Sequence, residues 1–380
     1  MHSKQSFIPF VVAGCLCTGF ILALFNTPSF SQTALPTEKV FLLLSEEGNI
    51  AVVDPLAAQL KRRIQVGSRP EYILLERDGK KAYVSNTKTN IISVVDVLKE
   101  MTDKIIHLPV ENPAITTGVL GYNAVKNQIY AAESPTDNSG SKVWIIDVAS
   151  DAITGSFDGG MKIAAISVSY DGKKIFVLNE SKSIGVFDAD TYSSLTTIQP
   201  MPVTTNDLKT PTFSVNPKKI KAVKPKKIGT QTIESGNIHI ARLACHPKKN
   251  IMYVTYGMLN KVQIINTDTY STESIVDIPS LYCGEQRDIY CSPDGQYAFI
   301  INHKTDYRTT NSVLILQVAK NEIIKLLDAG FVKNGLAVST DGKLLYTAGK
   351  DFKIFDLSTF ALLRSVQFQT EFAGMVTINQ

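Results

Sequence analysis

Short apolar segments alternate with polar turns along most of the chain, and one phrase of this pattern recurs. KKAYVSNTKTNIISVVDV (residues 80–97) has the pattern of two strands joined by a polar turn. IFVLNESKSIGVFDAD, MYVTYGMLNKVQIINTD and LLYTAGKDFKIFDLS repeat it further along. Each copy leads to a polar residue at the end of an apolar strand: Asp54, Asp96, Asp147, Asp188, Asn266, Gln317 and Asp356. The recurrence predicts seven copies of one structural unit.

Two further strands belong to each unit. An apolar strand and a turn precede most copies, as in ISVSYDGKK and IYCSPDGQ, where Asp-Gly marks a hairpin because glycine tolerates positive φ. Another turn and a fourth strand follow, as in LSTFALLRSV. Four antiparallel strands in about 40 residues are typical of a propeller blade, which packs both faces against its neighbours. The predicted fold class is all-β, a seven-bladed β-propeller of four-stranded antiparallel blades.

The first and last copies are incomplete in complementary ways. The first begins at Lys39 with no innermost strand before it. The chain ends in FAGMVTINQ (Phe372–Gln380), which matches the start of a blade and then stops. We expect this C-terminal strand to complete the first blade and close the ring, because closure removes exposed sheet edges.

The N-terminus departs from the repeat. Lys4 precedes Phe7–Phe25, an uncharged run of 19 residues, and a polar stretch follows. This order of basic, apolar and small residues is typical of a secretory signal, and Ser29 and Ser31 would place cleavage before Gln32. We therefore expect residues 1–31 to be a signal peptide and residues 32–380 to be a single propeller domain.

Two alternatives for this segment stay open. Residues 12–15 (VAGC) resemble a bacterial lipobox, which would make Cys15 an acylated N-terminus. The 19-residue run could also just span a bilayer as an uncleaved anchor. In every case we expect an exported body, periplasmic or extracellular, that touches the membrane only through its N-terminus.

Composition and charge add little to this picture. The chain has 380 residues, of which 44% are hydrophobic and 19% charged, as suits a globular protein with a sizeable core. The net charge of +4 is mild, and nucleic acid is not an expected partner of an exported protein. Outside the N-terminal run the cysteines are Cys245, Cys283 and Cys291. Three cysteines are too few for a disulfide framework, and they lack the paired ligand spacing of a zinc site.

YVSN (Tyr83–Asn86), followed by a strand ending in VVDV, resembles the YVTN-repeat family of bacterial seven-bladed β-propellers. The similarity covers about residues 38–380 and specifies a fold far better than an activity. It implies an exported binding protein, or a relative of propeller lactonases and of haem- or quinone-linked periplasmic redox subunits.

Departures from the repeat indicate where function lies. The loops Glu133–Ser141 and Asn302–Ser312 are longer than their counterparts, and residues 200–237 are inserted between the fourth and fifth blades. All three belong to connections that open onto the same face of a propeller, where elaborated loops on a rigid ring are expected to bind. The candidate binding residues in them are Asp137, Asn138, Asn302, His303, Asp306, Tyr307, Arg308, Lys218, Lys219, Lys226 and Lys227.

The insertion is rich in lysine and repeats PKKI at 217–220 and 225–228. Such a segment could contact an acidic surface, for example lipid head groups or a polysaccharide. It could equally be a solvated loop stiffened by proline, or a degenerate eighth blade.

Aligned inner strands define two columns of side chains. One column should face the core between blades: Ile73, Leu120, Ile166, Leu243, Ile289 and Leu336. Because side chains alternate along a strand, the second column should face the central channel: Tyr72, Val119, Ala165, Arg242, Asp288 and Gly335. Arg242 and Asp288 then lie side by side on adjacent blades, with Arg287, His239 and Lys162 nearby. They are either a charge pair that satisfies itself or a ligand anchor at the channel mouth. Cys245 and Cys291 also share a column on these blades, as packing thiols or as a bridge.

No catalytic constellation is evident. The sequence contains no HExxH, CxxCH, GxSxG, EF-hand or glycine-rich phosphate loop, so no catalytic residue, metal or cofactor is assigned. The leading hypothesis is a non-catalytic exported propeller that binds a protein, peptide or glycan through its elaborated face. The alternative is an enzyme or cofactor-bearing subunit, lactonase-like or redox, with its site at the channel mouth.

Overall fold

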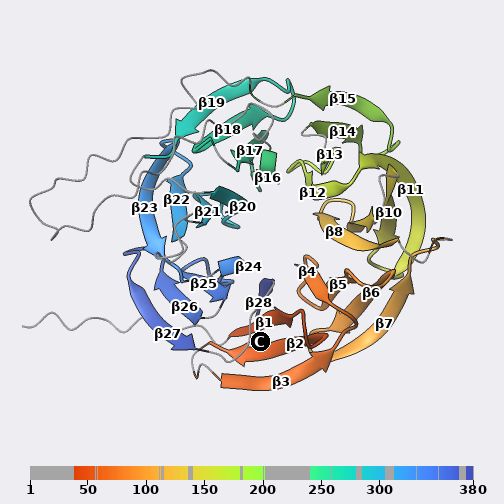
Figure 1. Ribbon diagram of the computed structural model, residues 1–380, viewed down its shortest axis with the longest axis horizontal. Helices are drawn as coiled ribbons and strands as arrows, with labels where there is room; N and C mark the ends of the chain where they lie inside the picture. The colour runs from red at the N-terminus through yellow and green to blue at the C-terminus, as the bar shows by residue number, and fades with distance from the viewer. Residues whose placement is uncertain are drawn as a thin grey trace, which may run out of the picture. The chain divides into compact units, whose positions relative to one another are not determined.

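The computed structural model describes residues 38–380, except 56, 58, 111, 113–114, 136–139, 180–182, 200, 202–239, 258, 280–284, 304–311, 331, 350, 368–373 and 380. All of these belong to the unit Pro36–Gln380. They form seven four-stranded sheets arranged as the blades of a ring (Figure 1). The predicted seven-bladed β-propeller is confirmed. No helix that could cross a membrane occurs among the described residues.

The first four blades follow chain order, with the innermost strand named first. Blade one contains β28 (Met375–Asn379), β1 (Glu38–Leu44), β2 (Asn49–Asp54) and β3 (Gln59–Gln65). Blade two contains β4 (Pro70–Leu75), β5 (Lys81–Asn86), β6 (Ile91–Asp96) and β7 (Met101–His107). Blade three contains β8 (Thr116–Asn123), β9 (Gln128–Ser134), β10 (Gly140–Asp147) and β11 (Ala152–Met161). Blade four contains β12 (Ile163–Val168), β13 (Lys174–Asn179), β14 (Ile184–Asp188) and β15 (Ser194–Ile198).

Three more blades complete the ring. Blade five contains β16 (Ile240–Cys245), β17 (Ile251–Tyr256), β18 (Lys261–Asn266) and β19 (Thr272–Asp277). Blade six contains β20 (Glu285–Cys291), β21 (Tyr297–His303), β22 (Ser312–Gln317) and β23 (Glu322–Asp328). Blade seven contains β24 (Val332–Val338), β25 (Leu344–Gly349), β26 (Asp351–Asp356) and β27 (Leu362–Gln367).

The C-terminal strand closes the ring as predicted. β28 pairs antiparallel with β1, with Asn379 opposite Glu38 and Met375 opposite Leu42. The first blade therefore joins the two ends of the described chain, and β28 covers the inner edge of β1.

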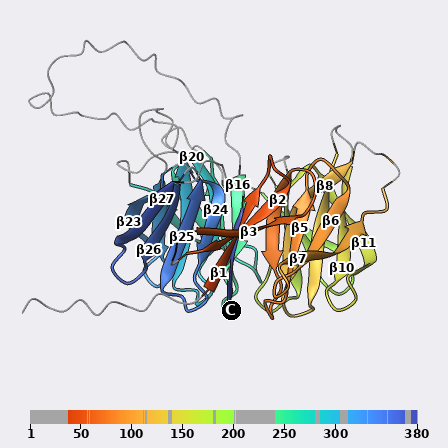
Figure 2. The same cartoon turned by 90° about the horizontal axis from the view of Figure 1, so that it is seen from below.

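The two faces of the ring carry different connections. On one face lie the connections between the second and third strands and the connections between blades. We call this face the loop face. The turn face carries the hairpins between first and second and between third and fourth strands. Figure 2 shows from the side how the strands of each blade run between these faces.

Polar residues end the third strands as the sequence predicted, and they fix the turn that follows. The Asp96 side chain accepts a hydrogen bond from the Lys99 N–H at 2.8 Å, and Asp188 accepts one from the Thr191 N–H at 2.8 Å. Four positions after these aspartates, Glu100 and Tyr192 have φ of 53° and 58°. The side chain thus stabilises a turn whose last residue reverses the chain into the fourth strand.

The core lies between adjacent blades. Each apolar inner-strand residue of the first predicted column packs into the cluster that its blade shares with the preceding blade. These residues are Ile73, Leu120, Ile166, Leu243, Ile289 and Leu336. The predicted core-facing column is confirmed.

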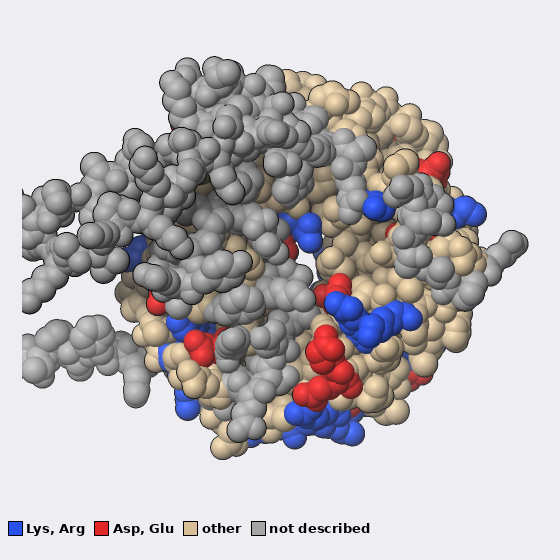
Figure 3. Space-filling view, viewed as in Figure 1, with Lys and Arg blue, Asp and Glu red and all other residues tan. Residues whose placement is uncertain are grey.

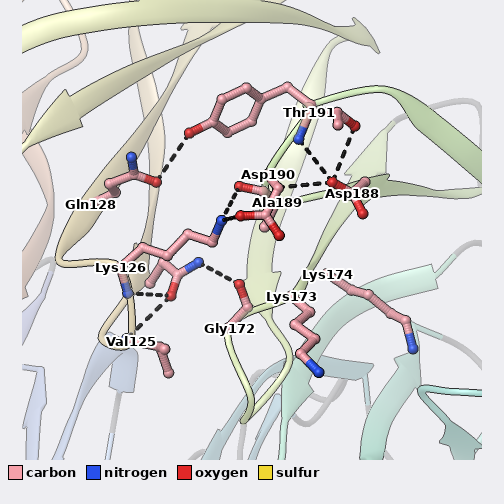
Figure 4. A network of polar contacts seen from close by, with 12 residues as sticks. Val125, Lys126, Gln128, Gly172, Lys173, Lys174, Asp188, Ala189, Asp190 and Thr191 are labelled. Carbon is pink, nitrogen blue, oxygen red and sulfur yellow. Dashed lines mark hydrogen bonds and ion pairs between the residues drawn. The ribbon is translucent and has the colours of Figure 1, made fainter.

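Lysines link consecutive blades at the turn face, a feature that the sequence pattern did not reveal. In the first four interfaces, a lysine at or near the start of a second strand pairs with an acid in the next blade's last hairpin. The pairs are Lys39–Glu100, Lys81–Asp151, Lys126–Asp190 and Lys174–Asp268. Figure 4 shows Lys126 reaching both the Asp190 carboxylate and the Ala189 carbonyl oxygen. In blade six Tyr297 begins the second strand instead and packs edge-on against Phe360 of blade seven, with 5.8 Å between ring centroids.

Candidate functional site

A recess of about 190 Å³ lies where the inner strands β4, β8, β12, β16 and β20 and the start of β28 meet. Its polar side chains are Glu71, Tyr72, Arg242, Asp288 and Tyr290. Val119 and Ala165 line the apolar side. Tyr72 and Arg242 are third residues of strands that begin at the loop face, so the recess lies toward that face. Figure 3 views this face and shows side chains of both charges beside the central opening.

β-Bulges position the side chains of the recess. In β4, β12, β16 and β20, the pairing with the second strand shifts just before Tyr72, Ala165, Arg242 and Asp288. A bulge bends the strand and re-aims the adjacent side chain. The same irregularity in successive blades turns corresponding side chains toward one recess.

Arg242 and Asp288 attract each other without a hydrogen bond. The Arg242 Nε atom lies 3.9 Å from Asp288 Oδ1, beyond the range of an N–H···O bond. Arg242 donates instead to its neighbour's carbonyl oxygen, from Nη1 to Ala241 O at 2.9 Å. The two side chains are 26% and 15% exposed, so both can be reached from the recess.

Asp288 is held by its own strand. Its Oδ1 accepts the Ile289 N–H and its Oδ2 accepts the Tyr290 hydroxyl, each at 2.9 Å. Burial raises the pKa of Asp288 above its ordinary value, although the Arg242 charge and these hydrogen bonds oppose the rise. The carboxylate is therefore fixed in orientation, with its charge poorly solvated.

Both phenols of the recess are held neutral. Burial raises the pKa of Tyr72, which also interacts with the Arg242 guanidinium. Burial and the Asp288 charge raise the pKa of Tyr290 well above its ordinary value. Tyr72 and Tyr290 thus act as hydrogen-bonding groups at neutral pH rather than as proton acceptors.

The other residues proposed for the channel mouth lie in different places. Lys162 lies in the connection between β11 and β12 on the loop face and does not line the recess. Arg287 belongs to β20, and its side chain is not described. His239 lies outside the described residues.

The two described members of the loop candidates have partners within the fold. Asn302 is fully buried and donates to the Ser312 hydroxyl at 3.3 Å. His303 Nε2 lies 2.7 Å from the Val332 carbonyl oxygen of blade seven. Strands β9 and β21 extend to Ser134 and His303, so both elaborated loops are shorter than the sequence indicated. Their ligand-binding role stays a prediction.

The remaining loop candidates fall outside the described residues. They are Asp137, Asn138, Asp306, Tyr307, Arg308, Lys218, Lys219, Lys226 and Lys227. Contact of the lysine-rich insertion with an acidic surface therefore stays a prediction, as does the alternative of an eighth blade.

The two described thiols serve different interfaces. Cys245 packs between blades four and five, whereas Cys291 packs between blades five and six. Both are free. Burial raises the pKa of Cys245 to about 12, so this thiol is a poor nucleophile at neutral pH.

Sequence reasoning missed Tyr290 and Glu71 as parts of the recess. Tyr290 lies two positions after Asp288, and alternation places such residues on the same side of a strand. The sequence signal for Tyr290 was therefore its position two residues after Asp288 in the same strand. Glu71 falls at the bulge of β4, which alternation does not describe.

Comparisons with known proteins agree with the fold. No family model matches the chain, and no curated protein matches its sequence. A functionally unknown protein from Desulfotomaculum acetoxidans superposes with a TM-score of 0.65 at 10% identity, covering 90% of this chain and 99% of that one. Kuenenia stuttgartiensis hydrazine synthase superposes with a TM-score of 0.58 at 15% identity, covering 80% of this chain and 88% of that one. AztD from Citrobacter koseri superposes with a TM-score of 0.56 at 10% identity, covering 90% of this chain and 98% of that one.

Identities this low establish architecture alone. The protein is a seven-bladed β-propeller with a polar recess among its inner strands. The more specific resemblance to the YVTN-repeat family stays a prediction from the sequence.

Proposed function

We propose that the protein is an exported, non-catalytic propeller that binds a protein, peptide or glycan partner through its loop face. The observation that carries this proposal is the recess, where Tyr72, Arg242 and Asp288 converge from three blades. Binding sites typically combine an apolar wall with a few convergent polar groups. The N-terminal apolar run supports export, with residues 1–31 as the leader and residues 32–380 as one propeller domain.

The chemistry of the recess suits binding better than reaction. Both phenols have raised pKa values, and Asp288 already accepts two hydrogen bonds. Arg242 offers several N–H groups in a planar fork. These groups orient a ligand without supplying an activated nucleophile.

One observation favours a second candidate, an enzyme or cofactor-bearing subunit such as a lactonase-like hydrolase or a periplasmic redox subunit. Burial raises the pKa of Asp288 within a recess, and perturbed carboxyl groups in recesses often act as general acids or bases. In that case the Tyr290 hydroxyl would orient the carboxyl group.

Native mass spectrometry of protein purified from its own host's envelope separates the two candidates. The binding proposal predicts a polypeptide that begins near Gln32, with no added mass of cofactor or metal size. An added mass of that size would overturn the proposal, provided that Arg242→Ala removes it. The matched control is Asp268→Asn, which removes an ion pair on the turn face and should leave the spectrum unchanged.

A further inference from the structure

The separation between Arg242 and Asp288 restricts the ligand. Arginine only donates hydrogen bonds and an ionised carboxylate only accepts them. The two groups are 3.9 Å apart and share no hydrogen bond, so one oxygen atom placed beside the pair can lie within hydrogen-bonding distance of both. That atom must accept from Arg242 and donate to Asp288, which is the property of a hydroxyl group.

Charge compensation argues against an ionic ligand. The Arg242 charge faces Asp288, and the nearby Glu71 carboxylate is paired with Arg69 at 3.2 Å. A bare anion would be repelled by Asp288, and a cation by Arg242. A neutral hydroxylated ligand leaves the pair compensated.

The walls of the recess suit a ring with one apolar face. Tyr72 and Tyr290 are half-buried and both line the recess beside the charged pair. Val119 and Ala165 supply the apolar side. A volume of about 190 Å³ is that of about six water molecules, which suits a single small ring.

From these contacts we infer that the recess binds one sugar ring of a saccharide, with one hydroxyl between Arg242 and Asp288 and the C–H face against the tyrosines. This inference rests on the proposed binding function and specifies its ligand class. The Tyr72 hydroxyl is the third polar contact.

The test uses the full chain and defined probes. Saturation-transfer NMR and calorimetry are performed with free glucose, galactose, mannose and N-acetylglucosamine, and with acetate as an anionic probe. We expect at least one sugar to bind and acetate not to bind. Arg242→Ala and Asp288→Asn should each weaken sugar binding at least tenfold, because hydrogen bonds to charged groups are lost.

Two further variants keep the test interpretable. Tyr72→Phe removes only a hydroxyl group and should weaken sugar binding severalfold, even if the charge variants fold poorly. Asp268→Asn breaks an ion pair between blades four and five on the turn face and should leave binding unchanged. Binding that none of the recess variants affects, or failure of every sugar to bind, would overturn the inference. Binding of acetate alone would show an anion site instead.

A parallel measurement separates this inference from the proposed function. Immobilised wild-type protein and the same variants are incubated with host envelope extract. If no sugar binds but a macromolecular partner is retained and lost with Arg242→Ala, only the saccharide inference fails. If sugar binds but no partner is retained, the macromolecular part of the proposed function fails.

Discussion

We predict that, among the ion pairs between blades, the one formed by Asp151 contributes most to the free energy of unfolding. Asp151 accepts hydrogen bonds from the Lys81 ammonium, at 2.7 Å, and from the buried Tyr83 hydroxyl, both of blade two. The Lys81 and Asp151 side chains are only 28% and 11% exposed. Asp151→Asn preserves the shape of the side chain, and Asn tolerates the φ of 50° found there. The variant removes the charge and leaves one amide oxygen where the carboxylate offers two acceptor oxygens, one to Lys81 and one to Tyr83.

The expected cost follows from the partners that remain. Hydrogen bonds to charged groups contribute roughly 1.5–3 kcal/mol, so Asp151→Asn should lower the free energy of unfolding by about 2 kcal/mol. The matched control is Asp277→Asn, whose carboxylate pairs with Lys261 at 2.6 Å but is 77% exposed. Exposed pairs contribute little, and this control should cost about 0.5 kcal/mol or less.

Urea unfolding followed by tryptophan fluorescence measures this difference at the relevant interface. Trp144 is the single tryptophan and packs in the same cluster as Tyr83, between blades two and three. A double-mutant cycle with Lys81→Met should show a coupling of about 1–2 kcal/mol. Equal losses for Asp151→Asn and Asp277→Asn, or a cycle without coupling, would refute the reasoning.

Three further predictions concern the ring and its hairpins. Deleting residues 375–380 removes the strand that pairs with β1, and at about 1 kcal/mol per hydrogen bond the loss should reach several kcal/mol, seen as a lower urea midpoint and faster proteolysis. Gly295→Ala should destabilise more than Gly342→Ala: both glycines have φ near +75° (76° and 73°), but only at Gly295 would a Cβ lie 2.5 Å from the His246 ring. An equal loss would show that backbone strain alone matters. Burial lowers the pKa of His246, whose Nδ1 accepts the Lys248 N–H, so the neutral form stabilises the fold. Its contribution is complete above about pH 6.5 and decreases as pH falls toward the folded pKa, because the unfolded chain then binds the extra proton. Urea unfolding of His246→Gln should lack this pH dependence, and an identical slope would contradict the assignment.

Much of the fold was predictable because each blade repeats its local signals. Asp96 and Asp188 end third strands because their side chains stabilise the following turn, a purely local interaction. Closure by the C-terminal strand followed from counting strands in the first and last copies. The placement of Arg242 and Asp288 followed from repeat alignment, since corresponding residues of adjacent blades meet around a ring.

Other features depend on three-dimensional offsets that no local pattern encodes. Lys174 and Asp268 are 94 positions apart, and their contact depends on how blade five docks against blade four. Cys245 and Cys291 share a column, and each thiol packs into the interface with its preceding blade, so the two thiols belong to different interfaces. The long Arg242 side chain, in contrast, reaches across to Asp288. The bulges arise from pairing between strands and leave no residue signature here.

The central claim, that the loop face binds the partner, can be tested by placing one photo-crosslinking residue on each face of the same blade. Lys162 precedes β12 on the loop face, and the exposed Lys173 lies in the β12–β13 hairpin on the turn face. In host cells, a crosslinker at position 162 should capture a partner that position 173 does not, and Arg242→Ala should reduce the capture. Capture from position 173 alone would contradict the account.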